Sequence, residues 1–376
     1  MLSSQGKVPS STGHVKFRST LPICCLIVSA CGGRSNGTIL VGAAGPYSEL
    51  TGDMARKGIE LAVAEINAAG GVRGRKIELL ERDDSASGKR AAAIAQEFVA
   101  NPEVVAVVGH VTSGAMVAAA KVYDGNLAAI GTSTTSPELT GISPWVFRVT
   151  SSDSINGSII ARFATRLGRK RAAIMYENDS YGRGLAAAFR NTFAGEVVSA
   201  DPISADLSDA EPYVAYYKKL APDVVFAIGL EGSGLALLRE ARRQHLAADF
   251  IGGDGWMGIV SDTAASEGVY VGATFTAEDP RPEIQKFVAA FRERYGTTPA
   301  MDAAAGYDAM QVMARAISGA GTDRSAIRRY LASLTTENAY HGLTGVIRFG
   351  PGGDPAESPY LVTRVHAGTF ALVTNR

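Results

Sequence analysis

The sequence predicts an α/β protein made of two successive units, each a mostly parallel sheet flanked by helices. Apolar runs typical of buried strands, such as 104–108, alternate with segments of helical periodicity, such as 54–69. This alternation produces βαβ units, in which helices cover both faces of a parallel sheet. The length of 376 residues suggests two domains, and the alternating pattern begins again after Thr150.

The first half is expected to alternate strands and helices. Strands are expected at 38–43, 76–82, 104–108, 127–130 and 145–150, with helices at 54–69, 90–100 and from Gly114 to Ala120. Helix-terminating residues support these bounds. Gly70-Gly71 ends the first helix and Asn101-Pro102 ends the second.

The second half repeats the pattern and adds three consecutive helices. Strands are expected at 171–176, 224–228, 250–253 and 269–275, and helices at 154–167, 185–193, 213–220 and 235–245, with a turn at 178–184. Helices at 282–295, 301–318 and 324–334 follow, and strands near 345–349, 360–366 and 370–374 close the chain. No low-complexity linker separates the halves.

The N-terminal segment has the order of a secretory signal. Basic residues between Lys7 and Arg18 precede an apolar stretch at 21–30, which ends at Cys31. Residues 28–31 also resemble a bacterial lipobox, so we expect residues 1–31 to be a signal peptide, Cys31 to be lipidated and 32–37 to be a flexible tether. The alternative is an ordinary signal peptide with a chance cysteine. All three cysteines fall within this segment, so the mature chain has no pair for a disulfide.

Composition excludes several classes of function. With 37 basic and 37 acidic side chains, the chain lacks the positive surplus that a nucleic-acid partner requires. No apolar run near 18 residues follows Cys31, so no membrane-spanning helix is expected. A phosphate-binding loop, a dinucleotide fingerprint and a nucleophile elbow are absent, and five scattered histidines lack metal spacing. We therefore expect no enzyme, cofactor or metal, and we expect His110, beside Ser113, to be a hydrogen-bonded structural histidine.

Two strand-to-helix turns are the candidate binding elements. Ser113 follows the strand at 104–108 and begins a helix, where unpaired amides favour a carboxylate or phosphate. The turn 131–137 follows the next strand and contains five hydroxyl residues, Thr135 among them. Ligands gather outside the carboxyl ends of parallel strands. The alternative is that Ser113 and Thr135 serve only in helix capping and turn chemistry.

Motifs along nearly the whole mature chain, about 38–374, resemble the leucine/isoleucine/valine-binding family of type I periplasmic binding proteins. These proteins are the receptor subunits of amino-acid ABC importers. The motifs that carry the resemblance are Gly45-Pro46, 64–76, Asp83-Asp84, Gly109-His110, 136–140, Phe147-Arg148, 181–184, 252–255, 307–309 and 342–345.

The resemblance implies roles for five residues. Ser113 is similar to the serine that holds the ligand carboxylate, and Thr135 to a threonine that contacts carboxylate and ammonium. Ser133 matches the position whose backbone carbonyl accepts a hydrogen bond from the ligand ammonium. Asp254 matches the acidic residue that pairs with this ammonium, and Tyr181 matches an aromatic residue that closes over the ligand. The alternative for Asp254 is a turn aspartate between glycines. In a water-filled cleft, Asp254 would have no partner, so Asp254→Asn is expected to leave the melting temperature of the ligand-free protein unchanged.

The sequence departs from the family at the ligand side-chain pocket. Thr51 and Leu230 stand where leucine-binding members have tyrosines, and Trp256 is expected to supply a wall instead. The family's disulfide, between segments around Asp84 and Thr112, has no cysteines here. Aliphatic, aromatic, polar and amide ligands therefore all stay open.

The resemblance implies a two-lobe fold with three crossovers. Lobe 1 is expected to hold 38–150 and 276–358, and lobe 2 to hold 151–275 and 359–376, with the ligand in the cleft. The implied function is extracytoplasmic capture of a small amino acid or related molecule for an ABC importer. The implied partners are ABC permease subunits and the membrane, through a lipid anchor. The alternative is a sensor of the same fold that signals to a regulator without transport.

Overall fold

The computed structural model describes residues 37–357 and 359–373, which contain two large, mostly parallel sheets. The predicted signal peptide, Cys31 and most of the predicted tether lie outside these residues. Within the described part of the chain, no helix combines the length and apolar character needed to cross a membrane.

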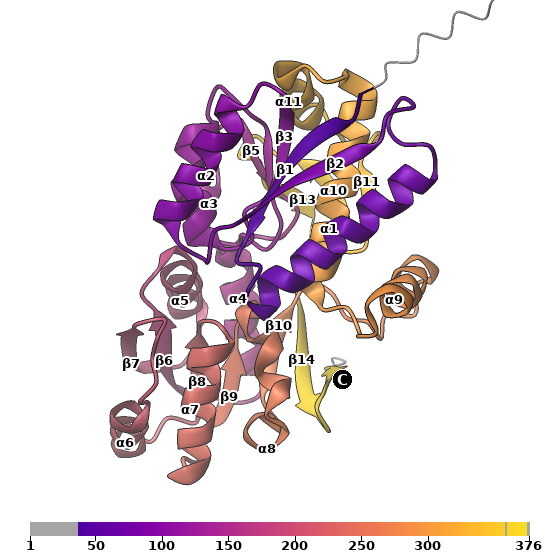
Figure 1. The fold of residues 1–376 in the computed structure, drawn as a ribbon. Helices are drawn as coiled ribbons and strands as arrows, with labels where there is room; N and C mark the ends of the chain where they lie inside the picture. The colour runs from indigo at the N-terminus through magenta and orange to yellow at the C-terminus, as the bar shows by residue number, and fades with distance from the viewer. Residues whose placement is uncertain (1–36, 358, 374–376) are drawn as a thin grey trace, which may run out of the picture. The chain divides into compact units, whose positions relative to one another are not determined.

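The first sheet has five parallel strands in the order β2-β1-β3-β4-β5. These strands are β1 (Ile39–Gly45), β2 (Ile77–Asp83), β3 (Val104–Gly109), β4 (Ala129–Gly131) and β5 (Val146–Arg148). Helices α2 (Gly88–Ala100) and α3 (Ser113–Tyr123) cover one face. Helices α1 (Leu50–Ala68), α10 (Met301–Ala320) and α11 (Arg324–Ala332) cover the other (Figure 1).

The second sheet has seven strands in the order β15-β14-β10-β9-β8-β6-β7. Its parallel strands are β6 (Arg171–Glu177), β7 (Glu196–Ile203), β8 (Val224–Ile228), β9 (Asp249–Gly252) and β10 (Tyr270–Ala273). Two antiparallel strands, β14 (Leu361–His366) and β15 (Thr369–Leu372), extend one edge.

Residues of β8 alternate between two cores because successive side chains of a strand point to opposite faces. Val224, Phe226 and Ile228 pack with helices α4 (Asp153–Arg166) and α5 (Ser180–Thr192). Val225 and Ala227 pack with α6 (Glu211–Leu220), α7 (Glu231–Arg243) and the 3₁₀ segment η2 (Asp254–Ser261). The parallel sheet is therefore buried on both sides, as the continuous apolar runs predict.

The chain passes between the two sheets three times: after β5, after β10 and before β14. Helix α9 (Pro282–Tyr295) follows the second passage. The third passage comes after a small antiparallel sheet of β11 (Tyr340–Gly342), β12 (Gly345–Phe349) and β13 (Pro355–Glu357). Short helices η1 (Pro137–Leu139) and α8 (Thr263–Ser266) complete the described elements. The predicted α/β class with three crossovers is confirmed.

Several predicted bounds were wrong for identifiable reasons. Strand β7 was not predicted, because this half-buried edge strand lacks clean alternation and contains Pro202. Helix α5 begins five residues earlier than expected, since the Asp179 carboxylate accepts a hydrogen bond from the Gly182 amide at 2.7 Å and caps it. Helix α1 likewise begins at Leu50, four residues before the predicted start at 54.

Candidate ligand-binding site

A cavity of about 340 Å³ lies where loops from both sheets meet. Its walls include residues that follow the carboxyl ends of β3, β4, β6, β8 and β9, the edge at which ligands of parallel sheets gather. Of the sequence-derived candidates, the cavity is lined by Thr51, Ser113, Ser133, Tyr181, Leu230 and Asp254.

The amino end of α3 forms one wall. Thr112, Ser113 and Gly114 line the cavity, and Thr112 makes no side-chain capping bond to the helix. The first amides of a helix have no intrahelical acceptor, so they and the helix dipole favour an anion here. The Ser113 Oγ accepts hydrogen bonds from the amides of Thr135 and Ser136, each at 3.1 Å. This leaves the Ser113 hydroxyl proton free to be donated to another acceptor.

The hydroxyl-rich loop after β4 contributes Ser133 but not Thr135. The Ser133 Oγ donates to the Asp302 Oδ1 at 2.6 Å. Thr135 is fully buried and is not among the cavity-lining residues; its carbonyl accepts from the Asp153 amide at 2.8 Å. In this structure, therefore, Thr135 lies behind the wall and not on it.

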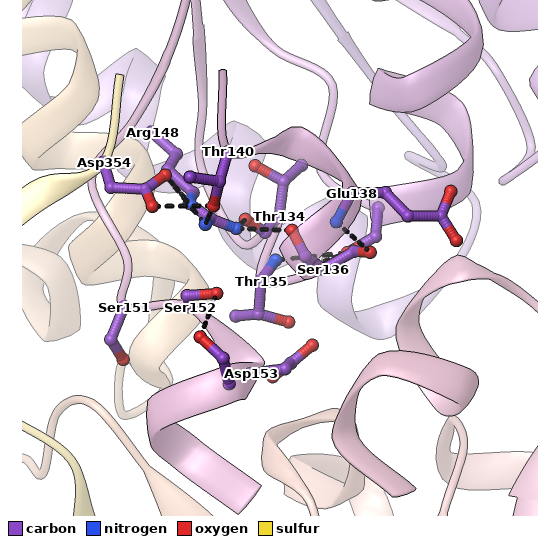
Figure 2. Close-up of polar contacts among 12 residues, drawn as sticks. Thr134, Thr135, Ser136, Glu138, Thr140, Arg148, Ser151, Ser152, Asp153 and Asp354 are labelled. Carbon is purple, nitrogen blue, oxygen red and sulfur yellow. Dashed lines mark hydrogen bonds and ion pairs between the residues drawn. The ribbon is translucent and has the colours of Figure 1, made fainter. Parts of the chain in front are cut away.

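A buried arginine holds this loop in place (Figure 2). Arg148, only 2% exposed, donates to the carbonyls of Thr134 at 3.2 Å and Ser136 at 2.8 Å. It also donates to the Thr140 hydroxyl at 2.9 Å, and its Nε lies 2.8 Å from the Asp354 Oδ1. Burial lowers the pKa of Arg148, so these contacts offset a real desolvation cost.

Arg148→Met is expected to lower the free energy of unfolding by about 2–4 kcal/mol, because two carbonyls lose the charged donor Arg148 and Asp354 loses its cationic partner. Thermal and denaturant unfolding measure the effect. Arg183→Met is the matched control, since Arg183 is 48% exposed and pairs with Glu138 at only 3.4 Å, which predicts a loss below about 1 kcal/mol. Equal losses in both variants would contradict the role of Arg148.

Tyr181 and Asp254 form the wall on the side of the second sheet. The Tyr181 Oη donates to the Asp254 Oδ1 at 2.9 Å and accepts from the Gly255 amide at 3.1 Å. Gly253 permits this approach, since a Cβ there would lie 2.3 Å from the Tyr181 Oη. Asp254 is 4% exposed, and burial raises its pKa to about 6. The expectation that Asp254 has no partner in the ligand-free protein was therefore wrong.

Three acidic residues of the cavity wall were not predicted from the sequence. Asp302 is the second residue of α10, Glu177 ends β6, and Asp179 caps α5. The carboxyl-end rule could have found Glu177, because it directly follows the strand predicted at 171–176. No local signal marks Asp302, since an acid in the first turn of a helix is ordinary.

Trp256 was expected to form a wall of the ligand side-chain pocket, and this prediction was wrong. The residue is 1% exposed and is not among the residues that line the cavity. Its ring packs over the backbone of two glycines, and a Cβ would approach it to 2.3 Å at Gly252 and 2.7 Å at Gly234. It belongs to the core between η2, α7 and the second sheet. The apolar part of the wall comes from Leu230, Val111 and Met301 instead.

His110 is hydrogen-bonded at both ring nitrogens. Its Nδ1 lies 2.6 Å from the Asp84 Oδ2 and its Nε2 3.0 Å from the Tyr123 Oη, and all three residues are fully buried. This agrees with the expected structural histidine. Across residues 37–357 and 359–373, no group of three or more His, Cys, Asp or Glu side chains is arranged to hold a metal ion.

The two large sheets share one cavity, and its walls include the amino end of a helix and buried carboxylates. This arrangement is typical of a small-molecule binding protein. A family model described as periplasmic binding protein matches residues 39–369. The chain belongs to this family, whose members bind substrates outside the cytoplasm, and it is therefore extracytoplasmic.

Named relatives and solved structures agree with this assignment. A Pseudomonas aeruginosa protein named leucine-, isoleucine-, valine-, threonine-, and alanine-binding protein is 31% identical, over 88% of this chain and 90% of its own. An ABC transporter substrate-binding protein from Desulfitobacterium hafniense, solved with leucine, is 32% identical with a TM-score of 0.78, covering 89% and 100%. A Streptococcus pneumoniae branched-chain amino acid binding protein, solved with isoleucine, is 27% identical with a TM-score of 0.83, covering 89% and 99%.

Proposed function

We propose that this protein is the substrate-binding subunit of an ABC importer and captures a small amino acid in the cavity. The observation that carries the proposal is a single cavity walled by both the uncapped start of α3 and the buried carboxylate of Asp254. An amino-acid backbone has one anionic and one cationic group, and this wall has a complement for each. The relatives named above, which bind amino acids, support the same function.

Each wall residue then has a specific role. The Ser113 hydroxyl and the amides that begin α3 donate to the ligand carboxylate. Asp254 pairs with the ligand ammonium, the Ser133 carbonyl accepts from the ammonium, and Tyr181 orients Asp254 through the 2.9 Å hydrogen bond. Thr135 contributes through its amide, which holds the Ser113 oxygen. Thr51 and Leu230 border the space for the ligand side chain.

The energies of these contacts suffice for tight capture. Charge-assisted hydrogen bonds contribute roughly 1.5–3 kcal/mol each. Three or four of them, less the cost of immobilising the ligand, reach the roughly 8 kcal/mol of a micromolar complex.

The division into lobe 1 (38–150 and 276–358) and lobe 2 (151–275 and 359–376) is part of the proposal, with closure about the three crossovers trapping the ligand. Each large sheet draws its strands from within one of these sets of residues, which supports the division. We propose binding and release to permease subunits without any catalysed reaction. The transport names of the relatives favour import over the alternative of a sensor.

A fluorescence thermal-shift screen tests the proposed function. The twenty amino acids are added separately at millimolar concentration, with acetate and methylamine as controls that each carry only one of the two charged groups. An amino acid that binds the folded protein raises the melting temperature by mass action. No shift with any amino acid would contradict the proposal.

We also propose that the mature protein is anchored through a lipid on Cys31. Replacing Cys31 with serine is then expected to move the protein from the membrane fraction to the soluble fraction, because the acyl chains are lost. Fractionation and mass spectrometry of the mature N-terminus measure both points. A wild-type protein that is wholly soluble, with its N-terminus elsewhere, would show that no lipid anchor exists.

A further inference from the structure

We infer that the captured amino acid is a cationic one, whose side-chain ammonium or guanidinium group pairs with Asp302. This inference rests on the proposed function, because it assigns the ligand side chain only after the ligand backbone is placed at Ser113 and Asp254. The geometry behind it is a second buried carboxylate on the wall of the same cavity.

The cavity has an excess of negative charge. Four carboxylates line it, those of Glu177, Asp179, Asp254 and Asp302, and no lysine, arginine or histidine is among the lining residues. A neutral amino acid brings one positive and one negative charge. It therefore leaves the whole excess in place when it displaces water, whereas a cationic amino acid removes part of it.

Two of the four carboxylates accept hydrogen bonds that stabilise the surrounding fold. Glu177 accepts hydrogen bonds from the Leu230 amide at 3.0 Å and the Ser233 hydroxyl at 2.6 Å. Asp179 accepts the capping bond from Gly182. Both residues therefore have structural partners that explain their position.

Asp302 and Asp254 instead accept side-chain hydrogen bonds from Ser133 and Tyr181, which themselves line the cavity. Asp302 is 3% exposed, and its one side-chain donor in the described chain is the Ser133 hydroxyl. Neither Asp302 nor Asp254 takes part in an ion pair formed among the described residues. A buried carboxylate without a cation is costly, and a ligand cation removes that cost.

The two carboxylates also repel each other. Burial, together with the charge of Asp254, raises the pKa of Asp302 to about 7. One α-ammonium at Asp254 offsets one of the two charges. A ligand with a second cationic group offsets both, while Met301, Leu230 and Val111 offer an apolar surface for its methylene groups.

Matched ligand pairs test the inference directly on the wild-type protein. Titration calorimetry compares lysine with norleucine and arginine with citrulline, because each pair has nearly the same shape and differs in the side-chain charge. Lysine and arginine are expected to bind at least about tenfold more tightly than their neutral partners, the effect of one buried charge pair. Equal affinity within both pairs would overturn the inference.

Two variants locate the effect. Asp302→Asn is expected to reduce the lysine-to-norleucine affinity ratio to near one, whereas Asp254→Asn is expected to weaken both ligands. Circular dichroism and melting curves establish that each variant is folded. If a folded Asp302→Asn protein keeps the tenfold preference, Asp302 is not the partner and the inference fails.

The outcomes also separate the inference from the proposed function. Tight binding of norleucine or leucine without binding of lysine would overturn the cationic ligand but leave the amino-acid importer intact. Failure of all four ligands and of leucine to bind would count against both.

Discussion

Asp254→Asn is expected to weaken amino-acid binding about a hundredfold or more. The carboxylate is 4% exposed, so a ligand ammonium paired with it is largely removed from water. Removing one partner of a buried ion pair leaves the other uncompensated, at a cost of about 3–5 kcal/mol. Since about 1.4 kcal/mol corresponds to a tenfold change in Kd, the loss exceeds a factor of one hundred. Titration calorimetry with lysine and with leucine measures it.

Asp249→Asn, at the amino end of β9, is the matched control. Asp249 begins β9 and pairs with Arg169 at 2.6 Å, and its side chain is 32% exposed, whereas Asp254 lies beyond the carboxyl end of β9. The control should bind either ligand with wild-type affinity. Unchanged affinity in Asp254→Asn would instead reduce Asp254 to a turn residue and favour an anionic ligand without an amine.

The ligand-free Asp254→Asn protein is expected to melt at a higher temperature than the wild type at pH 8. Burial raises the pKa of Asp254 to about 6, so at pH 8 the folded protein carries a desolvated charge. Asparagine removes that charge and retains an oxygen that can accept from Tyr181. This result differs from the unchanged melting temperature that the sequence predicts, because Asp254 is buried and accepts a hydrogen bond from Tyr181.

The melting temperature of the ligand-free wild type is expected to fall as the pH rises from roughly 4 to about 7. Burial raises the pKa of Asp302 to about 7 and those of Asp254 and Asp308 to about 6. Between roughly pH 4, where these groups titrate in the unfolded chain, and their raised values, the folded state binds more protons. Stability is therefore highest at the acidic end of this window and is lost as the pH rises.

The expected size of this effect is large. At about 1.4 kcal/mol per pKa unit, the shift of Asp302 alone corresponds to a loss on the order of 4 kcal/mol. Asp53 contributes to the pH dependence of stability with the opposite sign. Hydrogen bonds from Lys57 and Arg56 outweigh the effect of its burial and lower its pKa. Its contribution is lost below roughly pH 4, outside this window.

Calorimetric melting curves at pH 4.5 to 8 test the prediction, with Asp302→Asn as the informative variant. Its melting temperature should fall less with rising pH than that of the wild type, by several degrees over the window. Asp209→Asn is the control, because residue 209 is exposed on the loop before α6. A wild-type profile that rises with pH would contradict the buried, uncompensated carboxylates.

Local patterns were sufficient to predict most of the secondary structure. The sequence predicts β8 at 224–228 and β12 at 345–349 with the bounds that the structure has. These runs are apolar except for Arg348 and are bounded by turn residues, so local periodicity and hydrophobicity decide them. Strand β7 escaped prediction because an edge strand needs only half-buried residues, and its pairing partner β6 decides where it lies.

Some residues of the candidate site were predicted correctly from the sequence, and others were not. Ser113 follows a strand and lines the cavity, as the rule for carboxyl ends of parallel strands predicts, and Asp254, whose role the family resemblance implies, lines the cavity as well. Trp256 follows a strand as well, yet it packs into the core under Gly252 and Gly234, because the space beside two glycines decides its direction. No spacing in the sequence could distinguish these two outcomes.

The sequence by itself therefore determined the α/β class and the family, whose resemblance implied the three crossovers, and it singled out the start of α3, which lines the cavity. Only the tertiary structure decided that Asp302 lies on the same cavity as Asp254, since 47 positions of chain, including the second passage between the sheets, separate them. It also decided that both carboxylates are buried, which changes their pKa values and the expected effect of their removal. Burial depends on which distant segments pack around a side chain, and local sequence does not contain that information.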